Sequence, residues 1–174
     1  MVEGLFGLKE VSKNSQNQII LPAEFRDIFE EYSPSGRFYV YMEEERSLIL
    51  STLDELMGDI RNAQKNILET FDKNAFTVIS KNMTIVSMGN DGRVTLSKEM
   101  MEKAGIRKED KKVICCGINN KVEIWSLKRY REQIDDREIE YTSQKKLFEK
   151  EVFKFSLPRV QEDNKNNNTE KSDR

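Results

Sequence analysis

Apolar and polar positions follow the same pattern in two stretches of the chain. Residues 11–29 read VSKNSQNQIILPAEFRDIF, and residues 86–104, which begin 75 positions later, read VSMGNDGRVTLSKEMMEKA. In each stretch a β-favouring pair precedes a polar tip with a turn former, Asn17 or Gly92, and a short strand and a helix start follow. Few identities are shared, but the physical pattern repeats. The sequence therefore predicts two copies of one structural unit.

Each copy continues in the same way after its short helix. A strand pair is predicted over residues 38–42 and 47–50 in the first copy, and over residues 113–116 and 121–125 in the second. A longer amphipathic helix is predicted after each pair, and in the first copy it begins at the capping box TLDE. The predicted unit is hairpin, short helix, hairpin and long helix, twice.

Local signals mark the ends of the short helices and the second hairpin. Pro22 is expected at the first helical position, where its missing amide hydrogen is no loss. Ser97 is the predicted N-cap of the second short helix, and Gly105 is its predicted C-terminal cap. The run NDG at residues 90–92 is a strong hairpin signal.

Neither copy has enough apolar residues for a core of its own, so the two are expected to pack together as a pseudo-dimer. The expected fold class is α+β, mainly β. The predicted organisation is a first module at residues 8–55, a helical connector at 56–83, a second module at 84–128, a C-terminal helix at 129–155 and a tail at 161–174. The tail, QEDNKNNNTEKSDR, has no apolar side chain and is predicted to be disordered.

The composition excludes most enzyme chemistry. The chain has 174 residues and no histidine, so it offers no Ser-His or Cys-His nucleophile and no imidazole acid or base. Its two cysteines, Cys115 and Cys116, are adjacent in a predicted strand and point to opposite faces, so they are interpreted as structural. We find no phosphate-binding glycine loop, metal cluster or nucleophile and base pair in the sequence. We therefore expect no enzyme, cofactor, metal site or small-molecule substrate.

The net charge of −2 conceals a gradient along the chain. Residues 1–60 carry 5 basic and 12 acidic side chains, whereas residues 61–160 carry 21 and 15. A polyanion would therefore be met by the second half. The run RKEDKK at residues 107–112 is interpreted as a mixed, exposed loop and only weak evidence for DNA contact. No segment resembles a signal peptide or a transmembrane helix, so we expect a cytoplasmic protein without a membrane partner.

Several short stretches carry a resemblance by their residues, order and spacing. They are LFG at 5–7, QIILPAEFR at 18–26, DGRVTL at 91–96, AGI at 104–106, KVEIW at 121–125 and KRY at 128–130. Together they are similar to the MraZ family of bacterial transcriptional regulators, whose members carry two tandem SpoVT-AbrB-type modules. The resemblance covers roughly residues 5–145.

The resemblance implies a fold and a function. The implied fold is two AbrB-like swapped-hairpin modules that form a pseudo-dimeric β-barrel with flanking helices. The implied partners are promoter DNA with short direct repeats and further copies of the same chain in a ring-shaped homo-oligomer. The implied function is a repressor in the cytoplasm and nucleoid, which acts on its own promoter and on the cell-division and cell-wall gene cluster.

The sequence departs from the family at its DNA-binding motif. Family members carry Asp-x-x-x-Arg at the first hairpin of each module, and the arginines are expected to face DNA. The first copy has Asn14 and Gln18 at these positions, so both charges are replaced by neutral amides. The second copy has Gly89 and Arg93, so it keeps the arginine and loses the aspartate.

The expected DNA-binding residues are Arg93, Asn90, Asn14, Gln18, Lys13 and Lys9. The guanidinium fork of Arg93 suits a phosphate or a guanine edge, and the amides can recognise adenine. Lys9 and Lys13 are expected on the strand before the first hairpin, where they could add positive charge. Asp91 is the candidate to orient Arg93 in place of the missing aspartate. Because amides release no counterions, the first module is expected to be the electrostatically weaker one.

Loss of three of the four motif charges leaves an alternative open. The chain could be an oligomeric structural or interaction protein of the same fold, with weakened or lost DNA binding. A second alternative is an antitoxin-like regulator that also holds a toxin partner, because the same small fold serves such proteins. The tandem modules argue against this second alternative, and the predicted disordered tail keeps it open.

Overall fold

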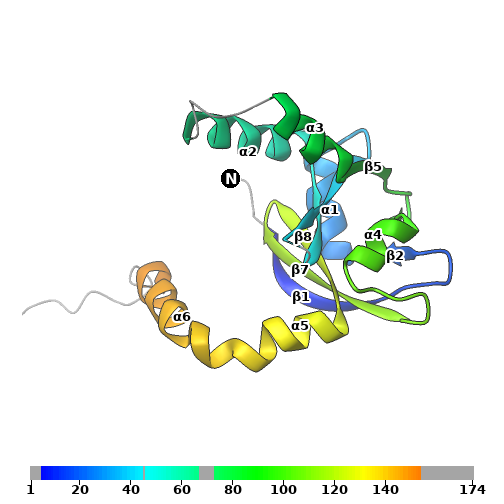
Figure 1. Ribbon diagram of the computed structural model, residues 1–174. Helices are drawn as coiled ribbons and strands as arrows, with labels where there is room; N and C mark the ends of the chain where they lie inside the picture. The colour runs from blue at the N-terminus through cyan, green and yellow to red at the C-terminus, as the bar shows by residue number, and fades with distance from the viewer. Residues whose placement is uncertain (1–4, 45, 67–72, 154–174) are drawn as a thin grey trace, which may run out of the picture. The chain divides into compact units, whose positions relative to one another are not determined.

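A computed structural model describes residues 5–44, 46–66 and 73–153 of the chain (Figure 1). The strands are β1 (Leu5–Ser12), β2 (Gln18–Ile20), β3 (Arg37–Glu43), β4 (Ser47–Ser51), β5 (Met83–Ser87), β6 (Arg93–Thr95), β7 (Lys112–Asn119) and β8 (Lys121–Ser126). The helices are α1 (Ala23–Tyr32), α2 (Leu53–Asn66), α3 (Lys73–Lys81), α4 (Lys98–Lys103), α5 (Leu127–Gln133), the 3-10 turn η1 (Asp135–Arg137) and α6 (Glu138–Phe153). This confirms an α+β, mainly β fold. The tail at residues 161–174 lies outside the described residues.

The two copies of the sequence repeat exchange their first strands. The main sheet has six strands in the order β1-β7-β8-β4-β3-β5, and all neighbours in it are antiparallel. Strand β1 of the first copy pairs with β7 of the second, and β5 of the second copy pairs with β3 of the first. The strand order therefore reads the same from both ends when the copies are interchanged, which is the arrangement of a strand-swapped pseudo-dimer.

The remaining strands, β2 and β6, form an antiparallel two-stranded ribbon. Isolated bridges join this ribbon to the chain just beyond the two edge strands, Lys13 to Ile19 after β1 and Met88 to Val94 after β5. The ribbon thus links the two edges of the main sheet and closes the strands around one core.

The core is shared by both copies. Its largest fully buried side chains include Trp125, Phe25, Phe29, Phe38, Ile19, Leu21, Leu48, Leu50, Leu96, Met101 and Ile106. Phe29 and Phe38 pack with ring centroids 4.9 Å apart. Full burial of such side chains contributes roughly 1.5 to 3 kcal/mol each relative to exposure. Because these residues come from both copies, neither copy could bury its apolar face alone.

The ends of the short helices lie where the sequence predicts them, except that the start of α1 is shifted by one residue. The hydroxyl of Ser97 accepts a hydrogen bond from the Met100 amide at 3.2 Å, which confirms it as the N-cap of α4. Gly105 follows the last turn of α4 with φ +70°, as a C-terminal glycine cap requires. Pro22 is the N-cap of α1, with φ −52° and ψ 144°. The prediction that Pro22 occupies the first helical position was therefore wrong by one residue.

The predicted C-terminal helix is interrupted. Helix α5 ends at Gln133 and is capped by Ile134, whose amide donates to the Tyr130 carbonyl at 2.9 Å, and η1 and α6 follow as separate elements. Two aspartates, Asp135 and Asp136, come directly after this point, and aspartate competes with helical hydrogen bonding in helix interiors. Two compact units result, Met1–Asp136 and Arg137–Arg174. None of the helices in the described residues is long and apolar enough to cross a membrane.

Candidate nucleic-acid interface

The β2–β6 ribbon has one buried and one exposed face. Ile19 lies opposite Val94 in the register, and both side chains are fully buried in the core. Because side chains alternate along a strand, the neighbours of these residues point the other way. That outer face consists of Gln18, Ile20, Arg93 and Thr95. Arg93 lies opposite Ile20 and Gln18 opposite Thr95, so the ribbon presents the two motif positions on one surface.

The hairpin before β6 holds Arg93 in a defined position. The Gly89 amide donates to the Arg93 carbonyl at 2.8 Å, and the Gly92 amide donates to the Gly89 carbonyl at 2.8 Å. Asp91 contacts Arg93 twice: one carboxylate oxygen accepts from the Arg93 amide at 3.1 Å, and the other lies 3.1 Å from its guanidinium. Both side chains are about half exposed, so this ion pair is weakly stabilising by itself. Its geometric effect is to fix the guanidinium direction at the surface.

The hairpin before β2 has the same backbone and different chemistry. The Asn14 amide donates to the Gln18 carbonyl at 3.0 Å, as the Gly89 amide does to Arg93 in the second copy. The Asn14 side-chain oxygen accepts from the amides of Gln16 and Gln18, and its side-chain nitrogen donates to Gln18 Oε1 at 2.8 Å. Asn17 occupies the turn with φ +58°, where the second copy has Gly92 at +78°. The first hairpin is thus held by side-chain hydrogen bonds of Asn14, and it is uncharged from Asn14 to Gln18.

The two predicted lysines have different surroundings. Lys13 is only 5% exposed, and its ammonium donates to the carbonyl oxygens of Lys108 at 3.2 Å and Asn14 at 3.4 Å. Its side chain therefore points into the protein. Lys9 lies on β1 and forms an ion pair with Glu24 at the start of α1, at 3.1 Å. The pKa of the Glu24 carboxyl is held below its usual value, first by a hydrogen bond from the backbone of Glu24 itself and then by the contact with Lys9. Asn90 is exposed at the tip of the second hairpin.

One residue that the sequence patterns did not indicate supports the second hairpin. Arg26, on α1 of the first copy, donates to the Asp91 carbonyl at 2.9 Å. Its side chain fills the space beside Gly92, because a Cβ atom added there would lie 2.0 Å from Arg26 Cδ. Residues 65 positions apart in the sequence are thereby brought into contact by the strand exchange. No local motif could have revealed this contact.

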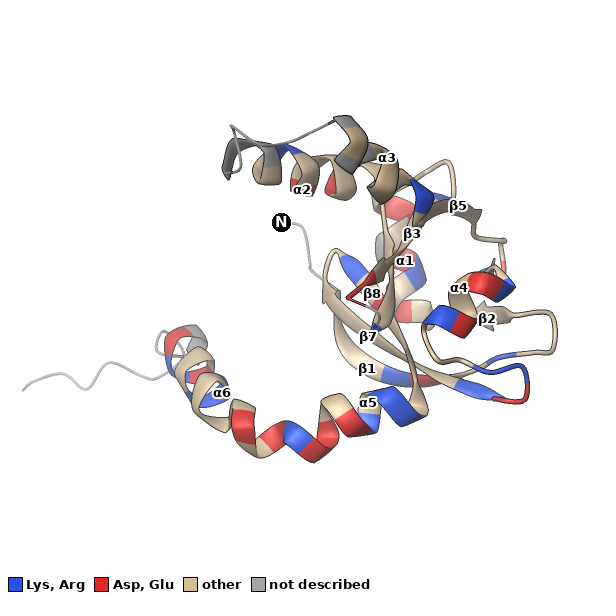
Figure 2. Cartoon of the chain, in the orientation of Figure 1, with Lys and Arg blue, Asp and Glu red and all other residues tan. Residues whose placement is uncertain are grey.

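A basic hollow of about 820 Å³ lies beside the loop between α4 and β7. Its charged lining residues are Arg107, Asp110, Lys111, Lys112, Lys128, Arg129, Arg131 and Glu132. Figure 2 shows charged positions along this loop, whereas β2 carries none. Arg129 donates to the Lys103 carbonyl at 2.7 Å and packs against Gly105, so it fixes the junction of α4 and the loop.

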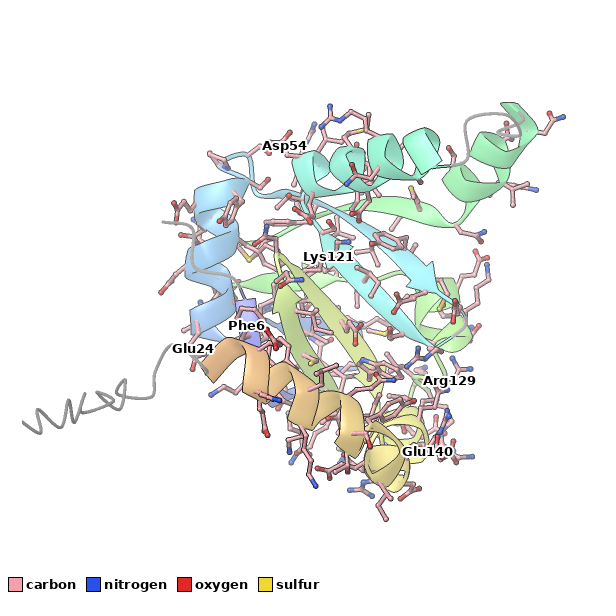
Figure 3. The ribbon with its side chains drawn as sticks, turned by 90° about the vertical axis from the view of Figure 1, so that its left-hand side faces the viewer. Phe6, Glu24, Asp54, Lys121, Arg129 and Glu140 are labelled. Carbon is pink, nitrogen blue, oxygen red and sulfur yellow. The ribbon has the colours of Figure 1, made fainter. Side chains whose placement is uncertain are left out.

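A second hollow, of about 280 Å³, has the opposite character. It lies between α2 and the sheet, at Lys121 (Figure 3). Lys121 forms an ion pair with Asp59 of α2. Glu43, Glu55 and Glu123 also line it. Burial raises the pKa of the Glu123 carboxyl. The excess of carboxylates makes this region unsuited to a polyanion.

Comparisons with known proteins all point to the same family. A model of the MraZ family, described as "MraZ protein, putative antitoxin-like", matches residues 80–150. The transcriptional regulator MraZ of Mycoplasmopsis pulmonis is 31% identical over 150 residues, which cover 78% of this chain and 90% of that protein. The transcriptional regulator MraZ of Mycoplasma mobile is 28% identical over 152 residues, covering 84% and 97%. That of Thiobacillus denitrificans is 28% identical over 133 residues, covering 74% and 84%.

Proposed function

The chain belongs to the MraZ family of transcriptional regulators, and from this premise we propose that it is a sequence-specific DNA-binding repressor whose β2–β6 ribbon contacts the DNA. Its relatives are named as regulators and not as enzymes, in agreement with the non-enzymatic protein expected from its composition. The observation that carries the proposal is the exposed two-stranded ribbon with Arg93 and Gln18 on its outer face.

A two-stranded β-ribbon fits the major groove of B-DNA, where every base pair presents a distinct pattern of donors and acceptors. Arg93 and Gln18 are diagonal neighbours on the ribbon, a spacing of roughly 7 to 8 Å in antiparallel pairs. A guanidinium carries five N–H donors, so Arg93 can hold Asp91 and still donate to a guanine edge or a phosphate. Asn14 and Asn90, at the two hairpins, extend the contact along the groove, with Asp91 as the orienting group.

One ribbon makes few contacts with DNA, so high affinity requires several ribbons to bind the same DNA molecule. We propose that the chain forms a ring-shaped homo-oligomer that engages short direct repeats in promoter DNA, where linked contacts raise avidity by about 10² to 10⁴. Exposed apolar side chains on neighbouring strands β1 and β7 support self-association: Phe6 is 69% exposed, and Ile118, its register partner, is 41% exposed. In this proposal the ring occupies its own promoter and that of the cell-division and cell-wall cluster, in the cytoplasm and nucleoid.

A gel-shift assay on the DNA directly upstream of the gene tests the proposal. At roughly 50 mM salt, where electrostatic binding is favoured, the wild-type chain should shift this DNA, and Arg93→Ala should weaken the shift. Mass photometry of both proteins should give the same ring mass. If mass photometry shows intact rings and the gel shift shows no DNA binding, the proposal that the chain is a repressor is refuted.

The uncharged first hairpin favours one alternative, an oligomeric interaction protein that keeps the fold without DNA binding. It is supported by the side-chain hydrogen bond between Asn14 and Gln18, which occupies the groups that would otherwise face DNA. The same assay separates the two functions, because the alternative predicts rings that leave the upstream DNA unshifted.

A further inference from the structure

Each hairpin base is hydrogen bonded to a loop of the other sequence copy. The Lys13 amide donates to the Lys111 carbonyl at 2.7 Å, and at the equivalent place the Met88 amide donates to the Gly36 carbonyl at 2.9 Å. The two loops are therefore equivalent neighbours of the two hairpins. The loop of the second copy lies beside the first hairpin, and the loop of the first copy lies beside the second.

The two equivalent loops differ in charge. The loop that ends at Gly36 reads SPSG and is uncharged, whereas residues 107–112 read RKEDKK and have a net charge of +2. The residue at the hairpin base differs as well, since the first copy has Lys13 where the second has Met88. The buried Lys13 ammonium donates to the Lys108 carbonyl at 3.2 Å, which ties the charged loop to the neutral hairpin.

Not all cations of this loop are available. Arg107 forms ion pairs with Asp110 and Glu109, at 3.4 Å each. Lys112 forms an ion pair with Glu10 on the neighbouring strand. Lys108 and Lys111 are exposed, and among the described residues neither has an acidic partner.

We propose that Lys108 and Lys111 bind DNA phosphates beside the first hairpin, so that the loop of the second copy supplies the positive charge that this hairpin lacks. The inference rests on the proposed DNA-binding function. It changes the expected difference in positive charge between the two hairpins. The second hairpin has Arg93 and a neutral neighbouring loop, whereas the first hairpin is neutral and its neighbouring loop carries Lys108 and Lys111. Lys13 is a positioning residue, because it holds this loop against the hairpin.

The physical consequence is a division of roles. Lysine contacts with phosphates release counterions and raise affinity for any sequence, whereas the arginine and amides of the ribbon can distinguish base edges. Each phosphate contact adds about 0.9 to the slope of log K against log salt concentration. Removing Lys108 and Lys111 should therefore lower this slope by about 2 for each subunit in contact, and leave the preference for specific over unrelated DNA unchanged.

The test measures binding to a duplex from the region upstream of the gene, and to a scrambled duplex, at salt concentrations from about 50 to 200 mM. The variants are K108Q/K111Q, the charge-retaining K108R/K111R, and R93Q. The matched control is R61Q/K81Q, which removes two exposed cations from α2 and α3. We expect K108Q/K111Q to lower the salt slope for both duplexes. K108R/K111R and the control should both keep the slope of the wild type.

A separate variant tests the tether. Lys13→Met replaces the residue by the one that the second copy uses, so the fold should be kept. Loss of the contact with the Lys108 carbonyl should lower the salt slope, though less than K108Q/K111Q does. Circular dichroism and ring mass should match the wild type for every variant.

The outcomes are distinct. If the wild type binds and R93Q reduces its preference for the specific duplex, but K108Q/K111Q behaves like the control, the inference is wrong and the proposed function stands. If the wild type binds neither duplex at about 50 mM salt, the proposed function and the inference fail together.

Discussion

The contact between Arg26 and Gly92 makes a quantitative prediction about how the modules support each other's hairpins. A Cβ atom at Gly92 would lie 2.0 Å from Arg26 Cδ and 2.8 Å from its Nε, so Gly92→Ala must displace the arginine. Displacement breaks the 2.9 Å hydrogen bond to the Asp91 carbonyl, and a hydrogen bond from a charged donor contributes roughly 1.5 to 3 kcal/mol. The φ of +78° adds roughly 1 to 2 kcal/mol for an alanine.

The free energy of unfolding should therefore fall by about 3 kcal/mol in Gly92→Ala. In an Arg26→Ala background the clash and the hydrogen bond are already gone, so the same change should lower it by only about 1 kcal/mol, for the backbone alone. The coupling between the two positions is then about 2 kcal/mol. Asn17→Gly, at the equivalent turn of the first hairpin, is the control and should change stability by a few tenths of a kcal/mol.

Urea unfolding at one fixed protein concentration measures these differences, because association would otherwise shift the midpoint. Trp125 is the only tryptophan and is 1% exposed, so its fluorescence reports the loss of the core. If Gly92→Ala destabilises the Arg26→Ala protein as much as the wild type, the contact with Arg26 does not support the hairpin and the reasoning is refuted.

Two further predictions concern titratable groups. The hydrogen bond from Lys103 holds the pKa of the exposed Glu99 carboxyl below its ordinary value of 4.5, so this group stabilises the fold above that pH and loses its effect as the pH falls through the lower folded-state pKa. Urea midpoints between about pH 5 and pH 3 should therefore fall less steeply for Glu99→Gln, and an unchanged profile would contradict the assignment. Burial raises the pKa of Cys115 to about 12 and also raises that of Cys116. Because the thiolate is the reactive form, a thiol reagent at neutral pH should modify the native protein slowly and the urea-unfolded protein rapidly, and equal rates would show that the strand is not packed as described.

The parts of the fold that the sequence predicts are those with local causes. The hairpin tips follow from turn formers at Asn17 and Gly92, and both residues have positive φ in the structure. Ser97 caps its helix because a hydroxyl at that position can accept from the amide three residues on. The buried strand around Trp125 follows from the apolar residues Val122, Ile124 and Trp125, which sit in a predicted strand with a helix after it. Each of these signals lies within a few residues of the structure that it determines.

The contacts between the copies could not be predicted in this way. Arg26 and Asp91 are 65 positions apart, and Lys13 and Lys108 are 95 positions apart, so only the strand exchange brings them together. The sequence pattern predicts Lys13 as a DNA contact, and it gives no sign that this side chain is 5% exposed and hydrogen bonded to a distant loop. The sequence likewise predicts only a mixed, exposed loop at residues 107–112, because the neighbour of this loop, the neutral first hairpin, is distant in the sequence.

The central claim is that the ribbon reads DNA from the major groove, and methylation interference tests it most directly. Dimethyl sulfate modifies guanine N7 in the major groove and adenine N3 in the minor groove, and the two grooves carry different recognition edges. The proposed contact predicts that guanine N7 methylation within each repeat prevents binding, that adenine N3 methylation does not, and that Arg93→Gln removes one set of guanine signals. Interference confined to adenine N3, or absent from both positions while DNA still binds, would contradict it.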